Sequence, residues 1–271
     1  MFVAVLSDKP ELREQFCKLI GKETSKDSLA IYSSQSEGKK LWLVDPVHYP
    51  EKIQPLLQSL SLADLVVLLV DGISPKVGEL LVAINSMKID RGIIVSSIPL
   101  PVSGSVLDKY EKAADLNAAK EKVLAAQASA AGENTLGLIH KTSSVKSLGN
   151  MAFGALKSGS VKKNDKFFIL PDKKDLEVRS IHVDGSETDQ LSAVSAFELA
   201  YKGDLVEHGL LVPLRHEFQV ENIVNGKFNK SPFFKDELKG KIYAYSNMQF
   251  IEGHLSDNDL TLSTPLAIPY L

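Results

Sequence analysis

The stretch between residues 134 and 213 constrains the fold most, because short apolar or alternating runs are separated there by turn-forming clusters. The runs cover residues 151–156, 166–170, 176–183 and 193–199. Turn formers such as Gly159, Asn164 and Asp165 lie between them. This spacing is typical of a small antiparallel β-barrel. Gly154 and Gly159 are expected where a strand bends or turns without room for a side chain. We therefore predict an all-β domain over residues 134–213.

Residues 1–98 show a different pattern, in which apolar runs alternate with segments of helical periodicity. Expected strands cover residues 2–6, 28–33, 39–44, 65–70 and 92–96, and the second and third of these should pair antiparallel across a polar turn. A first helix is expected to start at Asp8, capped by that residue with Glu11 as its partner, and to end at Gly21. Two more helices are expected over 50–62 and 75–87. The sequence predicts an α/β domain over residues 1–98.

Two further segments complete the predicted organisation. Residues 99–133 open with a proline break and continue into a run rich in alanine, lysine and glutamate at 105–131. We predict one long helix there, capped by Ser105 with Asp108 three residues on, ended by Gly132, and packed on the first domain. Beyond residue 213, strands are expected at 218–222, 241–255 and 259–268. These make a shortened β segment over residues 214–271.

The sequence of the predicted barrel resembles that of a known family. Residues 147–166 read SLGNMAFGALKSGSVKKNDK and residues 177–181 read EVRSI. Both resemble the second-domain barrel of translational GTPases, with the best likeness to elongation factor Tu and the archaeal-type selenocysteine-specific elongation factors. The resemblance implies a P-loop GTPase-like α/β domain, the second-domain barrel and a third β domain. A barrel of another Greek-key family is the competing interpretation.

The sequence departs from this family where nucleotide would bind. The phosphate loop G-x-x-x-x-G-K-[ST] surrounds phosphates with backbone N–H groups and a lysine, but residues 7–14 read SDKPELRE. Lys9 is the single weak candidate for a nucleotide contact. The D-x-P-G-H element reads DPVHY, so Asp45 and His48 are vestigial catalytic candidates. SSIP at 96–99 replaces the guanine-reading N-K-x-D element. We expect a degenerate GTPase domain that binds no cofactor and is not an enzyme.

Composition excludes several other classes of function. Among 271 residues, 44% are hydrophobic and 24% charged, and the longest apolar run, 65–70, is too short to span a membrane. The single cysteine, Cys17, rules out an internal disulfide, and the six histidines lack the spacing of a zinc site. The first thirty residues do not resemble a signal peptide, so we expect a cytoplasmic protein without metal or membrane contact.

The charge distribution points to candidate residues for contact with RNA. The net charge of −3 argues against coating nucleic acid by charge alone. From residue 141 to 179, however, basic residues outnumber acidic ones nine to four. Lys141, Lys146, Lys162 and Arg179 are therefore candidates for contacts with RNA phosphates or a partner. Ordinary solvated charge is the competing interpretation. His140 and Lys141 stand where elongation factor Tu has an acidic pair, which puts recognition of an amino acid's α-amino group in doubt.

The sequence therefore favours an elongation-factor-like protein that binds tRNA, another RNA, the ribosome or a translation factor without a nucleotide switch. In elongation factors the second-domain barrel meets the acceptor end of aminoacyl-tRNA, and the resemblance implies a similar surface here. Two alternatives remain open. One is a translational GTPase that binds GTP weakly through Lys9, Asp45 and His48. The other is a protein-interaction scaffold that uses exposed sheet edges in residues 214–271.

Overall fold

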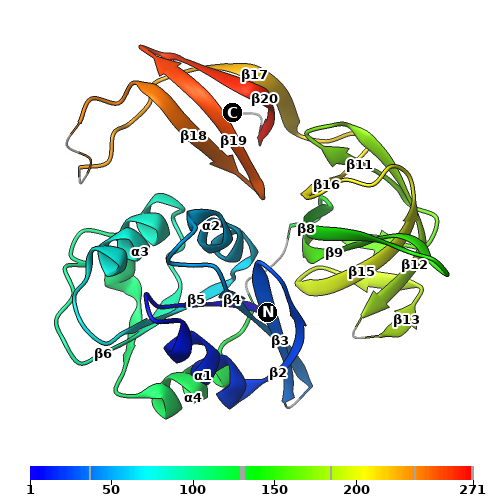
Figure 1. Cartoon of the computed structure of the whole chain (residues 1–271). Coiled ribbons are helices and arrows are strands. Elements are labelled where there is room, and N and C mark those ends of the chain that lie inside the picture. Colours follow the sequence, from blue (N-terminus) through cyan, green and yellow to red (C-terminus); the bar gives the residue numbers. More distant parts are fainter. Residues whose placement is uncertain (37, 129–131, 184, 233, 235, 270–271) are drawn as a thin grey trace. The chain divides into compact units, whose positions relative to one another are not determined.

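The chain divides into two compact units in the computed structural model, Met1–Ala130 and Ala131–Leu271. The structure describes residues 1–36, 38–128, 132–183, 185–232, 234 and 236–269. Figure 1 shows helices and a central sheet in the first unit and β-strands throughout the second. Each unit has its own hydrophobic core.

Unit 1 is a seven-stranded mixed sheet in the order β2-β3-β4-β1-β5-β6-β7. Its strands are β1 (Phe2–Leu6), β2 (Lys22–Lys26), β3 (Leu29–Ser36), β4 (Lys39–Pro46), β5 (Leu65–Val70), β6 (Gly92–Ser96) and β7 (Glu111–Ala113). The helices are α1 (Pro10–Ile20), α2 (Ile53–Leu62), α3 (Pro75–Ser86), the 3-10 helix η1 (Val106–Lys109) and α4 (Leu116–Ala125). The strands from β4 to β7 run parallel, and β3 pairs antiparallel with both β2 and β4.

The two faces of this sheet are covered by different helices. Successive side chains of β1 point to opposite faces, so Val3 and Val5 pack in the cluster that includes α1 and α4. Ala4 and Leu6 pack in the cluster that includes α2 and α3. Because both faces are covered, the central strands are apolar along their whole length. The predicted strands at 2–6, 65–70 and 92–96 are confirmed at both ends, whereas the exposed edge strand β2 was not predicted.

The predicted single helix at 105–131 is wrong. Ser105 caps only the short helix η1, through a hydrogen bond from Leu107 N to Ser105 Oγ of 3.2 Å. The chain then extends into β7, which pairs parallel with β6. Helix α4 starts only after Asp115, whose Oδ1 accepts a hydrogen bond from Ala118 N at 2.8 Å. The competing strand pairing and this local cap overrode the helix propensity of the segment.

The first unit consequently extends past residue 98, where the sequence analysis ended it. Strand β7 forms the edge of its sheet, and Ala119 and Val123 of α4 belong to its core. The expected packing of this segment on the first domain is confirmed, although the expected secondary structure is not.

Unit 2 begins with a closed six-stranded antiparallel barrel. Its strands are β8 (Leu136–Val145), β9 (Gly149–Ser158), β11 (Lys166–Leu170), β12 (Lys174–Val183), β15 (Ser195–Lys202) and β16 (Gly209–Pro213). The order is β11-β16-β8-β9-β15-β12, and pairing of β11 with β12 closes it. Short strands β10 (Ser160–Lys162), β13 (Ser186–Thr188) and β14 (Gln190–Ser192) flank the barrel. The four runs singled out in the sequence overlap β9, β11, β12 and β15.

Two glycines of the barrel lie where the sequence predicts no room for a side chain. A Cβ added to Gly154 would lie 2.1 Å from the carbonyl oxygen of Leu138 and 2.6 Å from the Phe197 ring. Gly159 has a φ of +70°, and a Cβ there would lie 2.5 Å from Thr135. Larger residues at either position would displace backbone or a packed ring, so these glycines are needed for strand pairing.

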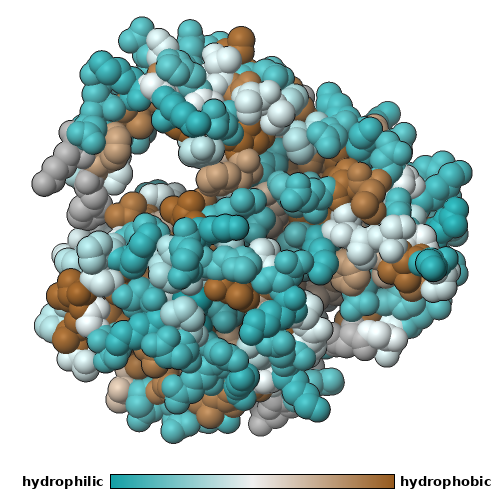
Figure 2. Space-filling model, in the orientation of Figure 1, coloured by the Kyte–Doolittle hydropathy of each residue, from teal (hydrophilic) through white to brown (hydrophobic). Residues whose placement is uncertain are grey.

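The rest of unit 2 is a four-stranded antiparallel sheet. Its strands are β17 (Phe218–Asn225), β18 (Gly240–Ser246), β19 (Gln249–Ser256) and β20 (Asp259–Pro269), in the order β17-β20-β19-β18. The strands predicted at 218–222 and 259–268 are confirmed, whereas the run predicted at 241–255 forms two strands, β18 and β19, joined by a turn at residues 247–248. Their apolar face forms a separate cluster that contains Ile251, Leu255 and Leu262. On the face of the molecule in Figure 2, hydrophobic side chains form small patches in a mostly hydrophilic surface.

Within the described ranges, every helix is too short or too polar to span a membrane.

Candidate functional site

The carboxyl ends of the central strands of unit 1 are the place where an open α/β sheet of this kind binds ligands. Three loops meet the sheet there, after β1, β4 and β5, and they contain all three unit 1 residues that the sequence singled out. Lys9 follows β1, and Asp45 and His48 lie at and just after the end of β4. The geometry around these residues decides what this edge of the sheet can bind.

A buried arginine occupies this edge. Arg13, on α1, is 0% exposed, and its guanidinium donates four hydrogen bonds. Nε donates to Asp45 Oδ1 at 2.6 Å, and Nη1 to the carbonyl oxygen of Ser7 at 2.7 Å. Nη2 donates to the carbonyl oxygens of Pro46 at 3.1 Å and Tyr49 at 2.9 Å. The guanidinium is thus held by acceptors from the loops after β1 and β4.

The pair of Arg13 and Asp45 fixes these two loops together. Asp45 is only 6% exposed. Burial raises the pKa of Asp45, and the nearby Arg13 guanidinium opposes that rise. Removing one member of such a buried pair leaves the other charge buried without a partner, which typically lowers the free energy of unfolding by about 3–5 kcal/mol. The carboxylate that the sequence marked as a vestigial catalytic group is therefore bound to a protein cation.

Lys9 and Asp8 also have partners within unit 1. Lys9 Nζ lies 2.5 Å from Asp71 Oδ2, and this hydrogen bond raises the pKa of Lys9. Asp8 Oδ2 accepts a hydrogen bond of 2.7 Å from the hydroxyl of Ser74, the residue that caps α3. The prediction that Asp8 caps α1 is wrong, because Lys9 holds that position without a side-chain cap and Pro10 begins the helix. Both side chains instead link the loop after β1 to the loop after β5.

His48 lies apart from the other candidates. Its side chain is exposed, whereas the next residue, Tyr49, is completely buried and donates its hydroxyl to the carbonyl oxygen of Lys76 at 2.8 Å. In the described part of the chain, no hydrogen bond or ion pair joins His48 to Asp45 or Lys9. The structure does not bring these three residues together as a catalytic group.

Sequence reasoning missed Arg13, although the sequence contains a signal for it. Arg13 lies on the same buried face of α1 as Phe16 and Cys17, at the spacing of three and four residues that defines one face of a helix. A charged residue on an apolar helix face needs a buried partner. Asp45, which directly follows the buried apolar run 41–44 of β4, is a carboxylate that could supply this partner.

The four basic residues predicted to contact RNA are all exposed on the barrel. Lys146 lies in the turn between β8 and β9, and Lys162 ends β10. Arg179 lies on β12, at the irregularity that follows Val178. Lys141 lies inside β8, opposite Phe153 of β9. All four side chains are on the same unit.

A row of paired barrel residues relates Lys146, Lys162 and Arg179 to one another. Asn150, just after the β8–β9 turn, pairs with Tyr201 of β15, which pairs with Val178 next to Arg179. The turn after Lys162 reaches the same place, because Asn164 N donates to the carbonyl oxygen of Val178 at 2.8 Å. Lys141 lies two residues from Ser143, which pairs with Met151 in the neighbouring row, so the register places Lys141 as near to Arg179 as Lys146 is.

No group of three or more histidine, cysteine, aspartate and glutamate side chains is placed to hold a metal ion in the residues that the structure describes.

Comparison with known proteins identifies the fold. The structure of translation elongation factor SelB from Methanococcus maripaludis, in complex with the GTP analogue GppNHp, matches 99% of this chain and 73% of its own chain, with a TM-score of 0.83 and 15% sequence identity. The chain has a translational GTPase-like fold. The apo form of the same SelB matches with a TM-score of 0.79. The elongation-factor resemblance predicted from the barrel sequence is thus confirmed for the fold.

Other relatives extend this comparison. A bacterial selenocysteine-specific elongation factor, EF-Sec, matches with a TM-score of 0.72 and 16% identity over 99% of this chain, which spans 54% of that factor. In sequence, the uncharacterized protein MJ0325 of Methanocaldococcus jannaschii is 23% identical over 93% of this chain and 87% of its own length. No protein-family model matches the chain. At 15% and 16% identity, the SelB and EF-Sec structures establish the translational GTPase-like fold alone.

Proposed function

We propose that this chain is an elongation-factor-like protein with a role in translation, in which unit 1 lacks a competent GTP site and the barrel of unit 2 binds RNA. The observation that carries the first part is the buried guanidinium of Arg13, which fills the carboxyl edge of the sheet and is paired with Asp45. The second part is supported by the exposed basic residues of the barrel, Lys141, Lys146, Lys162 and Arg179.

The connection between β1 and α1 argues against a phosphate cradle. Only Ser7, Asp8 and Lys9 lie between β1 and α1, whereas a phosphate loop needs a longer glycine-rich turn whose N–H groups point inward. Pro10 supplies no N–H donor. The carboxylate of Asp8 also lies at the loop, tied to Ser74. A triphosphate would therefore face the carboxylate of Asp8 and a loop of three residues, in place of a row of backbone N–H donors.

The internal pairing of the remaining candidates supports the same conclusion. In the phosphate-loop mechanism a lysine neutralises the phosphates and a carboxylate helps to hold magnesium. Here Lys9 pairs with Asp71, and Asp45 pairs with Arg13. Binding of GTP and magnesium would have to break both pairs, one of them buried, and would gain no cradle in return.

A nucleotide titration tests the first part of the proposal. Isothermal titration of the full chain with GTP or GDP, each with magnesium, should give no dissociation constant tighter than about 1 mM. A GTP-binding SelB serves as the positive control. A constant tighter than about 10 μM would show a working nucleotide site and would favour a translational GTPase.

A charge-reversal series tests the second part. Changing Lys146, Lys162 and Arg179 together to glutamate should weaken binding of a fluorescent tRNA and flatten its salt dependence, because three phosphate contacts are lost. The matched control reverses three exposed lysines of unit 1, Lys39, Lys88 and Lys112. Equal losses in both triple variants would indicate an effect of net charge and would remove these barrel residues as the RNA site.

A further inference from the structure

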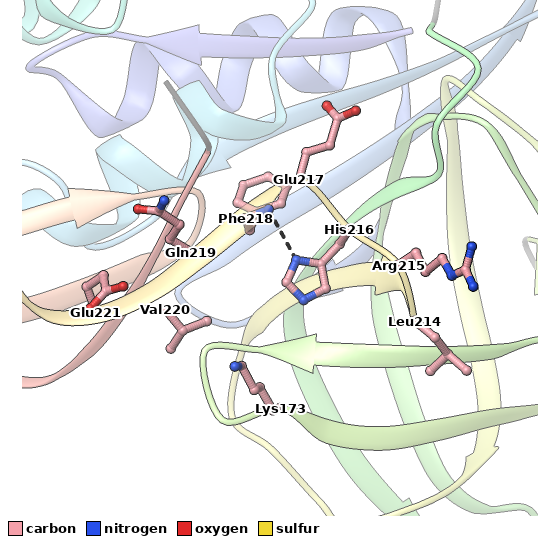
Figure 3. Close-up of a pocket in the computed structure, with 9 residues that line it drawn as sticks. All are labelled: Lys173, Leu214, Arg215, His216, Glu217, Phe218, Gln219, Val220 and Glu221. Carbon is pink, nitrogen blue, oxygen red and sulfur yellow. Dashed lines mark hydrogen bonds between the residues drawn. The ribbon is translucent and has the colours of Figure 1, made fainter.

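A pocket of about 730 Å³ lies in unit 2 beside the segment that leads from the barrel into β17. Its wall is made by residues 214–221 together with Lys173, which lies in the turn between β11 and β12. Figure 3 shows the side chains of His216 and Lys173 bordering the same opening, while Arg215 points away from it. The volume is within the range of about 300–1,000 Å³ that is usual for sites of small organic ligands.

The neutral ring of His216 has a defined tautomer and orientation. The backbone N–H of Phe218 donates to His216 Nδ1 at 3.1 Å. Because Nδ1 accepts this bond, the neutral ring carries its proton on Nε2. The ring also lies edge-on to Phe168, with centroids 6.4 Å apart and planes at 87°. His216 therefore presents a fixed N–H donor on Nε2, which faces the side of Lys173 in Figure 3.

Lys173 supplies a positive charge that is not committed elsewhere. Its exposed side chain forms no ion pair with any residue that the structure describes, whereas the adjacent Lys174 pairs with Asp204 at 3.0 Å. The two lysines follow one another in the chain, yet one is bound to a carboxylate and the other borders a pocket. An ammonium group and an N–H donor at one opening match an anion with several acceptor oxygens.

We propose that this pocket binds the phosphate of a nucleotide. The ammonium of Lys173 pairs with the phosphate, and Nε2–H of His216 donates to one of its oxygens. The ring of Phe218, whose centroid lies 6.4 Å from that of His216, offers apolar surface against which a base can stack. The inference rests on the proposed RNA-binding function and adds one nucleotide contact to it, separate from the four basic residues of the barrel discussed above.

The surrounding charges favour a single phosphate over a continuous polyanion. Glu217 and Glu221 also line the pocket. In Figure 3, Glu217 points away from the opening, and Glu221 lies at its outer margin on β17. A second phosphate near these carboxylates would be repelled, so the pocket should add one charge contact to RNA binding.

The test uses fluorescence anisotropy of a short single-stranded RNA with the full chain at several salt concentrations, and competition by AMP and by inorganic phosphate. Lys173→Glu should weaken RNA binding by about five-fold or more and reduce the slope of log affinity against log salt by about 0.7, the value for one phosphate contact on a single strand. Lys174→Glu, with the same change of charge one residue away, should leave affinity within about two-fold. His216→Phe keeps the ring but removes the donor, and should weaken binding without changing the salt slope.

The outcomes separate this inference from the proposed function. If RNA does not bind but a direct calorimetric titration shows AMP binding that Lys173→Glu abolishes, the pocket belongs to free nucleotides and the RNA function is contradicted. Binding of RNA and AMP that is unchanged in both Lys173→Glu and His216→Phe overturns the pocket. If that RNA binding still falls when Lys146, Lys162 and Arg179 are reversed, the proposed function stands without it. Absence of binding by RNA, AMP and phosphate contradicts both.

Discussion

At the scale of single residues, Arg13 has the largest consequences in unit 1. A fully buried guanidinium needs hydrogen-bond acceptors, and here one carboxylate and three carbonyl oxygens accept four hydrogen bonds from Arg13. The same contacts that stabilise the loops after β1 and β4 fill the edge at which a ligand would enter. Structural stability and the proposed lack of nucleotide binding therefore depend on the same side chain.

Replacing Arg13 by methionine should lower the free energy of unfolding by about 3–5 kcal/mol, because Asp45 is left buried without its partner. Urea denaturation followed by circular dichroism measures the change. Lys18→Met is the matched control on the same helix, since Lys18 forms an exposed pair with Glu14 at 2.5 Å that should contribute less than about 0.5 kcal/mol. Equal effects of the two substitutions would contradict the buried pair.

Buried tyrosines of unit 1 make its stability depend on alkaline pH. Burial raises the pKa values of Tyr32, Tyr49 and Tyr110 well above the usual value. The folded state keeps these phenols neutral, whereas the unfolded chain ionises them above about pH 10. Their stabilising effect is complete below about pH 10 and decreases as pH rises further. Absorbance at alkaline pH should show these phenols ionising only together with loss of helical circular dichroism; ionisation in the folded state would contradict their burial.

At the scale of elements, the sequence predicted most strands because strand signals are local. Alternation, apolar runs and turn residues located four of the six barrel strands and the strand-forming segments after residue 213. The segment 105–131 failed because its composition favours a helix, while pairing of β7 with β6 depends on a neighbour distant in sequence. Arg13 was missed for a related reason, since its partner Asp45 lies 32 residues away along the chain.

The break between β7 and α4 predicts the direction in which a substitution of Asp115 changes stability. Asp115→Ala should destabilise the protein by about 1 kcal/mol, because the side chain caps α4 through Ala118 N. In a continuous helix over 105–131, the same substitution would replace a weak helix former by the best one and would stabilise. Thermal or urea unfolding distinguishes the two, and a gain in stability would contradict the observed break between β7 and α4.

At the scale of the whole molecule, this chain has a translational GTPase-like fold made of two units with separate cores. In a translational GTPase, a nucleotide bound to the first domain changes what the remaining domains bind. The proposed function removes that step and leaves RNA binding on the barrel of unit 2. The sequence predicted this architecture through the barrel motif, whereas the contacts that fill the nucleotide edge required the structure.

The most direct test of this account is the affinity of the full chain for a fluorescent tRNA, measured without nucleotide, with GTP and magnesium, and with GDP and magnesium. We predict saturable binding with the same dissociation constant in all three conditions, within about two-fold. A GTP-binding SelB, measured in the same three conditions, serves as the positive control for a working nucleotide switch. An affinity that differs by about ten-fold or more between GTP and GDP would contradict the account and show that unit 1 is a working switch.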